Sequence, residues 1–219
     1  MPDFAQLREA MVEGQIAARG IREPLILQAL REVPREQFVP AKHAPDAYGD
    51  HPLPIEAGQT ISQPYIVALM IQAAEIGPDD RVLEVGAGSG YAAAVMSRIA
   101  RAVIAVERQH ALVEPARARL ERLGYDNVTI VEGDGTTGWP EEAPYDAIVA
   151  AASGSHVPRS LTDQLAPGGR LVMPLGDPGA VQNLIRIAKA ADGSLERSDL
   201  GEVRFVPLIG EEGWSDARY

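Results

Sequence analysis

The first part of the chain alternates between apolar segments of helical period and polar or proline-rich stretches. Gly20 is a stop signal after one such segment, and Pro24 and Pro64 suit the first turn of a helix. We therefore expect three helices, over residues 4–19, 24–31 and 64–75. Residues 34–60 are rich in Pro, Gly, Asp and His. This stretch is long for a structureless connection, so we expect a functional loop or short elements within it.

From residue 81 onward, short apolar runs alternate with amphipathic segments. The runs predict strands over residues 82–85, 103–106, 128–131, 147–150 and 170–173. The segments predict helices over residues 91–100, 112–123 and 159–165. Pro115 is unfavourable inside a helix, so we expect the middle helix to start near Glu114. Strands that alternate with helices indicate a mostly parallel sheet covered on both faces, with 183–188 and 202–208 as antiparallel edge strands.

A glycine-rich run joins the first of these strands to its helix. Gly86, Gly88 and Gly90 let the backbone bend sharply and let a ligand lie against bare peptide groups. The dinucleotide-binding loop is Gly-x-Gly-x-x-Gly. Here the third glycine comes one residue early, and Tyr91 stands where that pattern has a small residue. The run therefore predicts a nucleotide-like cofactor and disfavours a nicotinamide or flavin dinucleotide.

Three acidic residues accompany the predicted carboxyl ends of successive strands. Glu84 gives the pattern Glu-x-Gly-x-Gly-x-Gly, Glu107 ends the second strand, and Asp134 follows the third. Ligands of open α/β sheets bind at this edge, where a carboxylate can accept hydrogen bonds from ribose hydroxyls. A solvated carboxylate at a helix start and a plain Gly-Asp-Gly turn are the alternatives for Glu107 and Asp134. The glycine pattern with Glu84 resembles the first motif of class I S-adenosylmethionine-dependent methyltransferases.

A second segment is more specific. Gly58-Gln-Thr-Ile-Ser-Gln-Pro-Tyr-Ile-Val-Ala68 closely resembles the protein-L-isoaspartate O-methyltransferase family. The likeness includes Val82 to Tyr91, Gly133-Asp-Gly135, Ala143-Pro-Tyr-Asp146, Arg204-Phe-Val-Pro-Leu208, Arg19-Gly-Ile, Val33-Pro-Arg-Glu-Gln-Phe-Val-Pro40 and Leu53-Pro-Ile55. These segments cover nearly the whole chain in the family's order.

The resemblance implies a Rossmann-like class I methyltransferase fold with N-terminal helical and C-terminal strand additions. We expect one domain over residues 1–219: N-terminal helices and a substrate-side loop (1–76), a cofactor-binding core (77–175), and C-terminal edge strands and tail (176–219). It also implies methyl transfer from S-adenosylmethionine to the carboxylate of L-isoaspartyl residues, which starts their repair to aspartyl residues. S-adenosyl-L-homocysteine is the other product.

The resemblance also implies roles for individual residues. Ser62 matches the family's active-site serine, whereas the residues alone favour a helix N-cap before Pro64, and both roles are compatible. The residues expected to bind the cofactor are Thr60, Ile61, Gln63, Tyr65, Glu84, Gly86, Gly88, Ser89, Gly90, Glu107, Arg108, Asp134 and Gly135. Two positions depart from the family pattern. Ser153 stands in a loop expected to border the substrate cleft, and Glu56 is expected to face solvent.

Three other functions are weighed against this one. Another carboxyl or small-molecule O-methyltransferase would use the same scaffold. A non-catalytic module that binds the cofactor would not need to retain the segment around Ser62. A nicotinamide oxidoreductase is disfavoured by the glycine spacing. The four histidines have no metal-ligand spacing, so we expect no metal site, and Trp214 is a candidate for a lid near the C-terminus.

Composition sets broader limits. The formal charge of −11 argues against general binding to nucleic acid or anionic lipid. No run of about 18 apolar residues predicts a membrane span, and the first residues lack the basic and apolar regions of a signal peptide. The chain has no cysteine, which excludes disulfides and agrees with a reducing compartment. We expect a cytoplasmic protein that acts as a monomer on isoaspartyl proteins and peptides.

Overall fold

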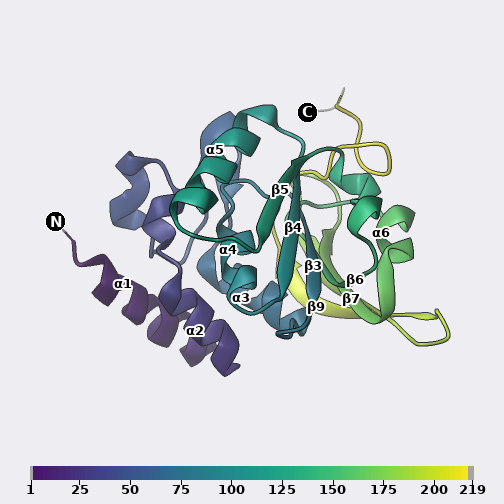
Figure 1. Ribbon diagram of the computed structural model, residues 1–219, viewed down its shortest axis with the longest axis horizontal. Coiled ribbons are helices and arrows are strands. Elements are labelled where there is room, and N and C mark those ends of the chain that lie inside the picture. Colours follow the sequence, from purple (N-terminus) through teal and green to yellow (C-terminus); the bar gives the residue numbers. More distant parts are fainter. Residues whose placement is uncertain (1, 217–219) are drawn as a thin grey trace.

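A seven-stranded sheet runs through the centre of the computed structural model, which describes residues 2–216 (Figure 1). Its strands are β3 (Arg81–Val85), β4 (Ala102–Glu107), β5 (Val128–Glu132), β6 (Tyr145–Ala150), β7 (Leu165–Leu175), β8 (Gln182–Lys189) and β9 (Leu195–Val203). The strand order is β5-β4-β3-β6-β7-β8-β9. All pairs from β5 to β7 are parallel, whereas β8 and β9 join as antiparallel neighbours. The prediction of a mostly parallel sheet with antiparallel additions is confirmed.

Helices cover both faces of this sheet because its strands bury side chains on both sides. Along β3, Val82 belongs to one apolar core, and Leu83 and Val85 belong to the other. The first core includes side chains of α3 (Pro64–Ala73), α4 (Tyr91–Ser97) and α5 (His110–Arg122). The second core includes Leu161 of α6 (Arg159–Asp163).

The N-terminal residues extend the first core. The helices α1 (Phe4–Met11) and α2 (Pro24–Glu32) lie at one end of the molecule in Figure 1 and bury Met11 and Leu30. A π-helical segment (Val12–Ile16) and a 3₁₀ turn (Ala17–Arg19) complete the first predicted helix, which ends at Gly20 with φ of 97°. Within residues 2–216, no helix is long and apolar enough to cross a membrane.

The predicted short elements between residues 34 and 60 are present. They are the 3₁₀ turns Arg35–Phe38, Ala41–Asp46 and Glu56–Gly58 and the two-stranded sheet of β1 (Leu53–Pro54) and β2 (Thr60–Ile61). Ile55 continues this hairpin, because its N–H donates to the Gln59 carbonyl at 2.9 Å. The long connection is therefore an ordered part of the N-terminal half.

Several predicted boundaries are wrong. The helix expected to start near Glu114 starts at His110, because Pro115 lies on its exposed face while Leu112 and Ala116 are buried beneath it. The helix predicted over 159–165 ends at Asp163, because Leu165 already begins β7. The helices predicted to end at residues 75 and 100 end in turns after Ala73 and Ser97.

The last edge strand is also misplaced by the sequence pattern. It was expected over residues 202–208 but spans 195–203. The apolar residues that suggested the later position pair elsewhere. The Ser153 N–H donates to the Val206 carbonyl at 2.8 Å, and the Leu208 N–H donates to the Ser153 carbonyl at 2.9 Å. This segment therefore leads the chain from the outer edge of the sheet back toward the carboxyl ends of the parallel strands.

Candidate functional site

The glycine loop joins β3 to α4 at the carboxyl edge of the sheet. Gly86, Gly88 and Gly90 have φ of 91°, 53° and 84°, in the left-handed region that favours glycine. A Cβ atom on Gly90 would lie 3.2 Å from Leu120 Cδ1 of α5. The early third glycine thus lets the loop pack against α5. Tyr91, the first residue of α4, is buried rather than turned toward the loop's open side.

Glu107 ties this loop to the end of the neighbouring strand. Its Oε2 accepts from the Gly88 N–H and its Oε1 from the Gln109 N–H, both at 2.8 Å. The side chain is buried at the end of β4. Each carboxylate oxygen has two lone pairs, so each can accept one further hydrogen bond. The prediction that Glu107 ends the second of these strands is confirmed, and its role in binding ribose stays a prediction.

Glu84 lies within β3 and is only 1% exposed. Burial raises the pKa of its carboxyl well above the usual value, and the negative charge of Glu107 raises the pKa further. The Ala93 backbone N–H of α4 acts in the opposite direction. Its Oε2 is buried without a hydrogen-bond partner within the described chain. The environment therefore favours the protonated form of Glu84.

Asp134 connects the turn after β5 to the C-terminal segment. Its Oδ1 accepts from the Thr136 N–H at 2.8 Å and the Thr136 hydroxyl at 2.7 Å. Its Oδ2 accepts from the Glu211 N–H at 2.7 Å. The close approach requires glycine at position 210, because a Cβ atom there would lie 2.0 Å from Asp134 Oδ1. The C-terminal segment is therefore anchored on a predicted site residue.

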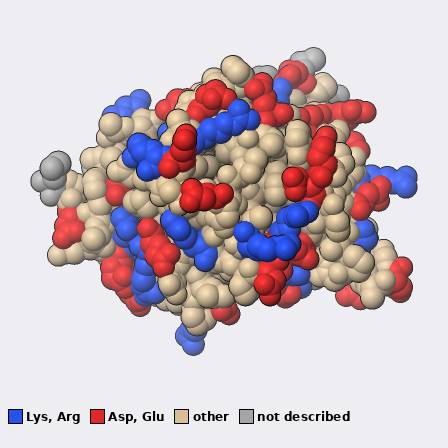
Figure 2. Space-filling model, viewed as in Figure 1, with Lys and Arg blue, Asp and Glu red and all other residues tan. Residues whose placement is uncertain are grey.

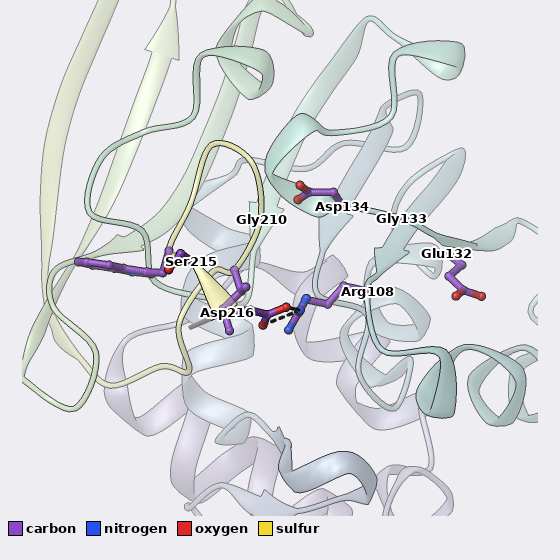
Figure 3. Close-up of a pocket in the computed structure, with 9 residues that line it drawn as sticks. Arg108, Glu132, Gly133, Asp134, Gly210, Ser215 and Asp216 are labelled. Atoms are coloured by element: carbon purple, nitrogen blue, oxygen red, sulfur yellow. Dashed lines mark hydrogen bonds and ion pairs between the residues drawn. The ribbon is translucent and has the colours of Figure 1, made fainter. Parts of the chain in front are cut away.

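A pocket of about 450 Å³ lies between this segment and the ends of β4 and β5 (Figure 3). It is lined by Arg108, Glu132, Gly133, Asp134, Ile209, Gly210, Trp214, Ser215 and Asp216. Figure 3 shows Arg108, which follows β4, meeting Asp216 of the C-terminal segment, and their Nη2 and Oδ2 atoms are 2.7 Å apart. The Trp214 Nε1–H donates to the Ser153 carbonyl at 2.9 Å. The pocket volume is in the range of small-molecule sites, about 300–1,000 Å³.

Ser62 lies between β2 and α3. The hairpin that leads to it packs on the glycine loop, since a Cβ atom on Gly88 would lie 3.5 Å from Ile55 Cδ1. The N-cap of α3 is Gln63, and no side chain caps this helix. The interpretation of Ser62 as the helix N-cap is therefore wrong, and its hydroxyl is not used in capping.

The remaining predicted residues differ in their burial. Thr60 is exposed, Ile61 is buried, and Gln63 and Tyr65 are half-buried beside Ser62. Ser89 is buried within the glycine loop, and its carbonyl accepts from Arg119 Nη1 at 2.8 Å. Gly135 packs beneath the site, because a Cβ atom there would lie 2.5 Å from Val85 Cγ1.

The two departures from the family pattern have separate explanations. Within the loop that was expected to border the substrate cleft, Ser153 is fully buried, and its hydroxyl donates to the Gly176 carbonyl at 2.9 Å. It holds the C-terminal segment in place. Glu56 is exposed, as expected, and its charge acts on Arg119 of α5. No group of His, Cys, Asp and Glu side chains suited to a metal ion occurs within residues 2–216.

The family model for protein-L-isoaspartate(D-aspartate) O-methyltransferase matches residues 6–213 of the chain. The chain belongs to this family. The protein-L-isoaspartate O-methyltransferase 2 of Pelobacter propionicus is 56% identical over 207 residues, which are 94% of this chain and 92% of that protein. The Methylorubrum extorquens protein-L-isoaspartate O-methyltransferase is 56% identical over 216 residues, or 99% and 94% of the two chains.

Solved structures of protein-L-isoaspartate O-methyltransferases agree with the fold. One superposes with a TM-score of 0.84 at 34% identity and covers 94% of this chain and 67% of the other. A putative family member from Plasmodium falciparum, in complex with S-adenosyl-L-homocysteine, has a TM-score of 0.79 at 27% identity and covers 92% and 98%. The predicted class I methyltransferase fold is confirmed, and this enzyme family replaces the oxidoreductase alternative.

Two residues around the methyltransferase site received no role from the sequence. Asp216 forms the ion pair with Arg108, and Arg35 is fully buried with its Nη2 2.7 Å from the Ser62 carbonyl. A signal existed for Arg35, because the segment Val33-Pro-Arg-Glu-Gln-Phe-Val is part of the family resemblance. Gly210 and Gly213, three residues apart, could have predicted a tight turn near the C-terminus.

Proposed function

We propose that this enzyme transfers a methyl group from S-adenosylmethionine to the free carboxylate of L-isoaspartyl residues in damaged proteins and peptides. The methyl ester starts the repair of these residues to aspartyl. One observation carries the proposal: in a chain of this family, the segment with Ser62 packs through Ile55 onto the glycine loop. The segment that binds the acceptor and the loop that binds the donor are therefore adjacent.

The residues present fit the cofactor. S-adenosylmethionine supplies a methyl group on a positively charged sulfonium. We assign the ribose hydroxyls to Glu107, whose oxygens keep free lone pairs, and the adenine amino group to Asp134 at the pocket wall. Further cofactor contacts are assigned to Thr60, Ile61, Gln63, Tyr65, Glu84, Gly86, Gly88, Ser89, Gly90, Arg108 and Gly135.

The acceptor chemistry needs alignment more than proton transfer. A free carboxyl titrates near pH 4, so the isoaspartyl side chain is already ionised at neutral pH and no general base is required. The Ser62 hydroxyl donates a hydrogen bond that orients this carboxylate. The positive end of α3, which begins two residues later at Pro64, favours the same anion. Holding the acceptor oxygen in line with the methyl carbon then accounts for most of the rate.

Replacing Ser62 tests this assignment. We expect Ser62→Ala to lower kcat about 100-fold, the typical loss for one positioned donor, while calorimetric affinity for S-adenosylhomocysteine stays unchanged. Ser198→Ala on exposed β9 is the matched control and should change neither quantity. A parallel collapse of affinity and turnover would instead place Ser62 in the cofactor site.

The function itself is tested with paired peptides. Labelled methyl groups from S-adenosylmethionine should be incorporated into a peptide with one isoaspartyl residue and not into the same peptide with a normal aspartyl residue. Equal labelling of both peptides would favour another carboxyl methyltransferase. Cofactor binding without any labelling would favour a non-catalytic module.

We further propose a single methyltransferase domain over residues 1–219, with parts 1–76, 77–175 and 176–219. We propose that it acts in the cytoplasm as a monomer and does not bind nucleic acid. The formal charge of −11 supports the last point. On the face shown in Figure 2, basic side chains are interspersed with acidic ones and form no continuous basic surface. Light scattering of the purified protein tests the monomeric state, and the same measurement with added nucleic acid tests the absence of binding.

A further inference from the structure

Arg35 is the largest fully buried side chain among the described residues, and its charge has no role in the site as assigned above. It begins the 3₁₀ turn Arg35–Phe38 in the N-terminal half. Burying a guanidinium costs several kcal/mol unless its partners compensate. An apolar side chain could fill the same volume at lower cost. The polar contacts of Arg35 must therefore have a role that an apolar side chain of the same volume could not fill.

Those contacts join three segments that are distant in sequence. The Nε–H donates to the Ala47 carbonyl at 2.7 Å, and Nη2 donates to the Ser62 carbonyl at 2.7 Å. The guanidinium carbon lies 4.6 Å from the centroid of the Tyr91 ring, in a cation–π contact. Tyr91 is the first residue after the glycine loop. One rigid group thus touches both the acceptor segment and the start of the helix that follows the cofactor loop.

The planar guanidinium holds these partners in fixed directions. Its N–H groups form a rigid fork, so the carbonyls of Ala47 and Ser62 cannot move independently. A lysine in the same place would carry the charge on a flexible stem without this fork. A displacement of about 1 Å at a reacting group can cost about 100-fold in rate. A guanidinium that fixes the backbone of Ser62 therefore affects turnover.

We propose that Arg35 is a positioning residue, which fixes the backbone of Ser62 relative to the glycine loop so that the Ser62 hydroxyl meets the acceptor carboxylate. This proposal rests on the proposed function of Ser62. Arg35 acts through Ser62 and through the ring of Tyr91.

A second arginine of similar construction provides the control. Arg170 on β7 donates from Nε to the Ala74 carbonyl at 2.8 Å and from Nη2 to the Glu75 carbonyl. Its side chain is 16% exposed. These carbonyls follow the C-terminal end of α3, whereas Ser62 precedes its N-terminal end. The helix has ten residues and is about 15 Å long, so Arg170 supports the same helix far from the site.

The test compares Arg35→Met, Arg35→Lys and Arg170→Met in the full-length protein. For each variant we would measure the melting temperature, the calorimetric affinity for S-adenosylhomocysteine, and kcat and KM for an isoaspartyl peptide. We expect Arg35→Met to lower kcat about 30-fold, with affinity for S-adenosylhomocysteine within about threefold, as misplacement of a reacting group predicts. Arg35→Lys should have an intermediate kcat. Arg170→Met should lower the melting temperature but leave kcat within about twofold, because it acts away from the reacting groups.

Several outcomes would overturn the positioning role. A wild-type kcat in Arg35→Lys would do so, and this variant decides the question if Arg35→Met does not fold. An equal loss of kcat in Arg35→Met and Arg170→Met would show a purely structural effect. If the wild-type enzyme does not label the isoaspartyl peptide, the proposed function and this proposal both fail. If the wild type is active and the Arg35 variants have the same kcat, only this proposal fails.

Discussion

Glu84 and Glu107 are two buried carboxyl groups at the same edge of the sheet, on the neighbouring strands β3 and β4. They differ in hydrogen-bond partners. Glu107 accepts from two backbone N–H groups at 2.8 Å each, whereas Glu84 has a buried Oε2 without a partner within the described residues. The degree of burial is nearly equal, so the partners account for the different environments of the two carboxyl groups.

The difference shows how the site reduces the repulsion between two buried carboxyl groups. Two carboxylates in a shared environment cannot both ionise without mutual repulsion. Burial and the charge of Glu107 raise the pKa of Glu84, so the protonated form is favoured there. Two backbone N–H donors hold the Glu107 carboxyl group beside the glycine loop.

Removing the better-partnered carboxylate should have the largest effect. We expect Glu107→Ala to weaken S-adenosylhomocysteine binding about 100-fold, because hydrogen bonds to a charged acceptor contribute about 1.5–3 kcal/mol each. Isothermal titration calorimetry measures this. Glu196→Ala on β9 is the control, since Glu196 is exposed and lies outside the residues that line the pocket. Unchanged affinity in Glu107→Ala would remove Glu107 from the ribose role.

Neutralising Glu84 should have a smaller effect, and one that depends on pH. The folded state binds the Glu84 proton more tightly than the unfolded chain, whose pKa is near 4.5. As the pH rises above that value, the unfolded state loses this proton first, so the stability of the wild type falls. Glu84→Gln has no such proton and avoids this loss.

The expected result is a melting temperature for Glu84→Gln that gains on the wild type as the pH is raised from about 4.5. Below that pH the two proteins should converge. Thermal denaturation of the cofactor-free proteins over a pH series measures the difference, with Glu196→Gln on β9 as an exposed control. A difference that is constant with pH would show that Glu84 keeps the same protonation state in the folded and unfolded chains.

The acidic residues at the carboxyl ends of the parallel strands were largely predictable from the sequence, because each lies within a short stretch of the chain. The strand that ends at Glu107 and the turn that holds Asp134 are each contained in a short strand–turn unit. Parallel strands bring such units to one edge whatever the rest of the chain does. The acidic pattern therefore located Glu84, Glu107 and Asp134 on neighbouring strands, but not the different environment of Glu84.

The acceptor side and the C-terminal segment were not predictable in this way. The hydrogen bond from Arg35 to the Ser62 carbonyl spans 27 residues, and the contact from Arg108 to Asp216 spans 108. Such pairs depend on tertiary packing, which periodicity does not encode. The same reason explains the misplaced edge strand, since Val206 and Leu208 pair with Ser153 rather than with β8.

Asp216 extends the comparison to an exposed carboxylate and should give the smallest effect. Its side chain is 71% exposed and pairs with Arg108 across the pocket. Exposed ion pairs contribute about 0–1 kcal/mol, so we expect Asp216→Asn to weaken S-adenosylhomocysteine binding by no more than about fivefold at low salt. Screening should remove the difference near 1 M salt, where the Debye length is about 3 Å. Asp163→Asn, which breaks the exposed pair with Arg159 on α6, should show no change at either salt concentration. A loss of affinity that persists at high salt would mean that Asp216 contacts the cofactor directly rather than holding the C-terminal segment through Arg108.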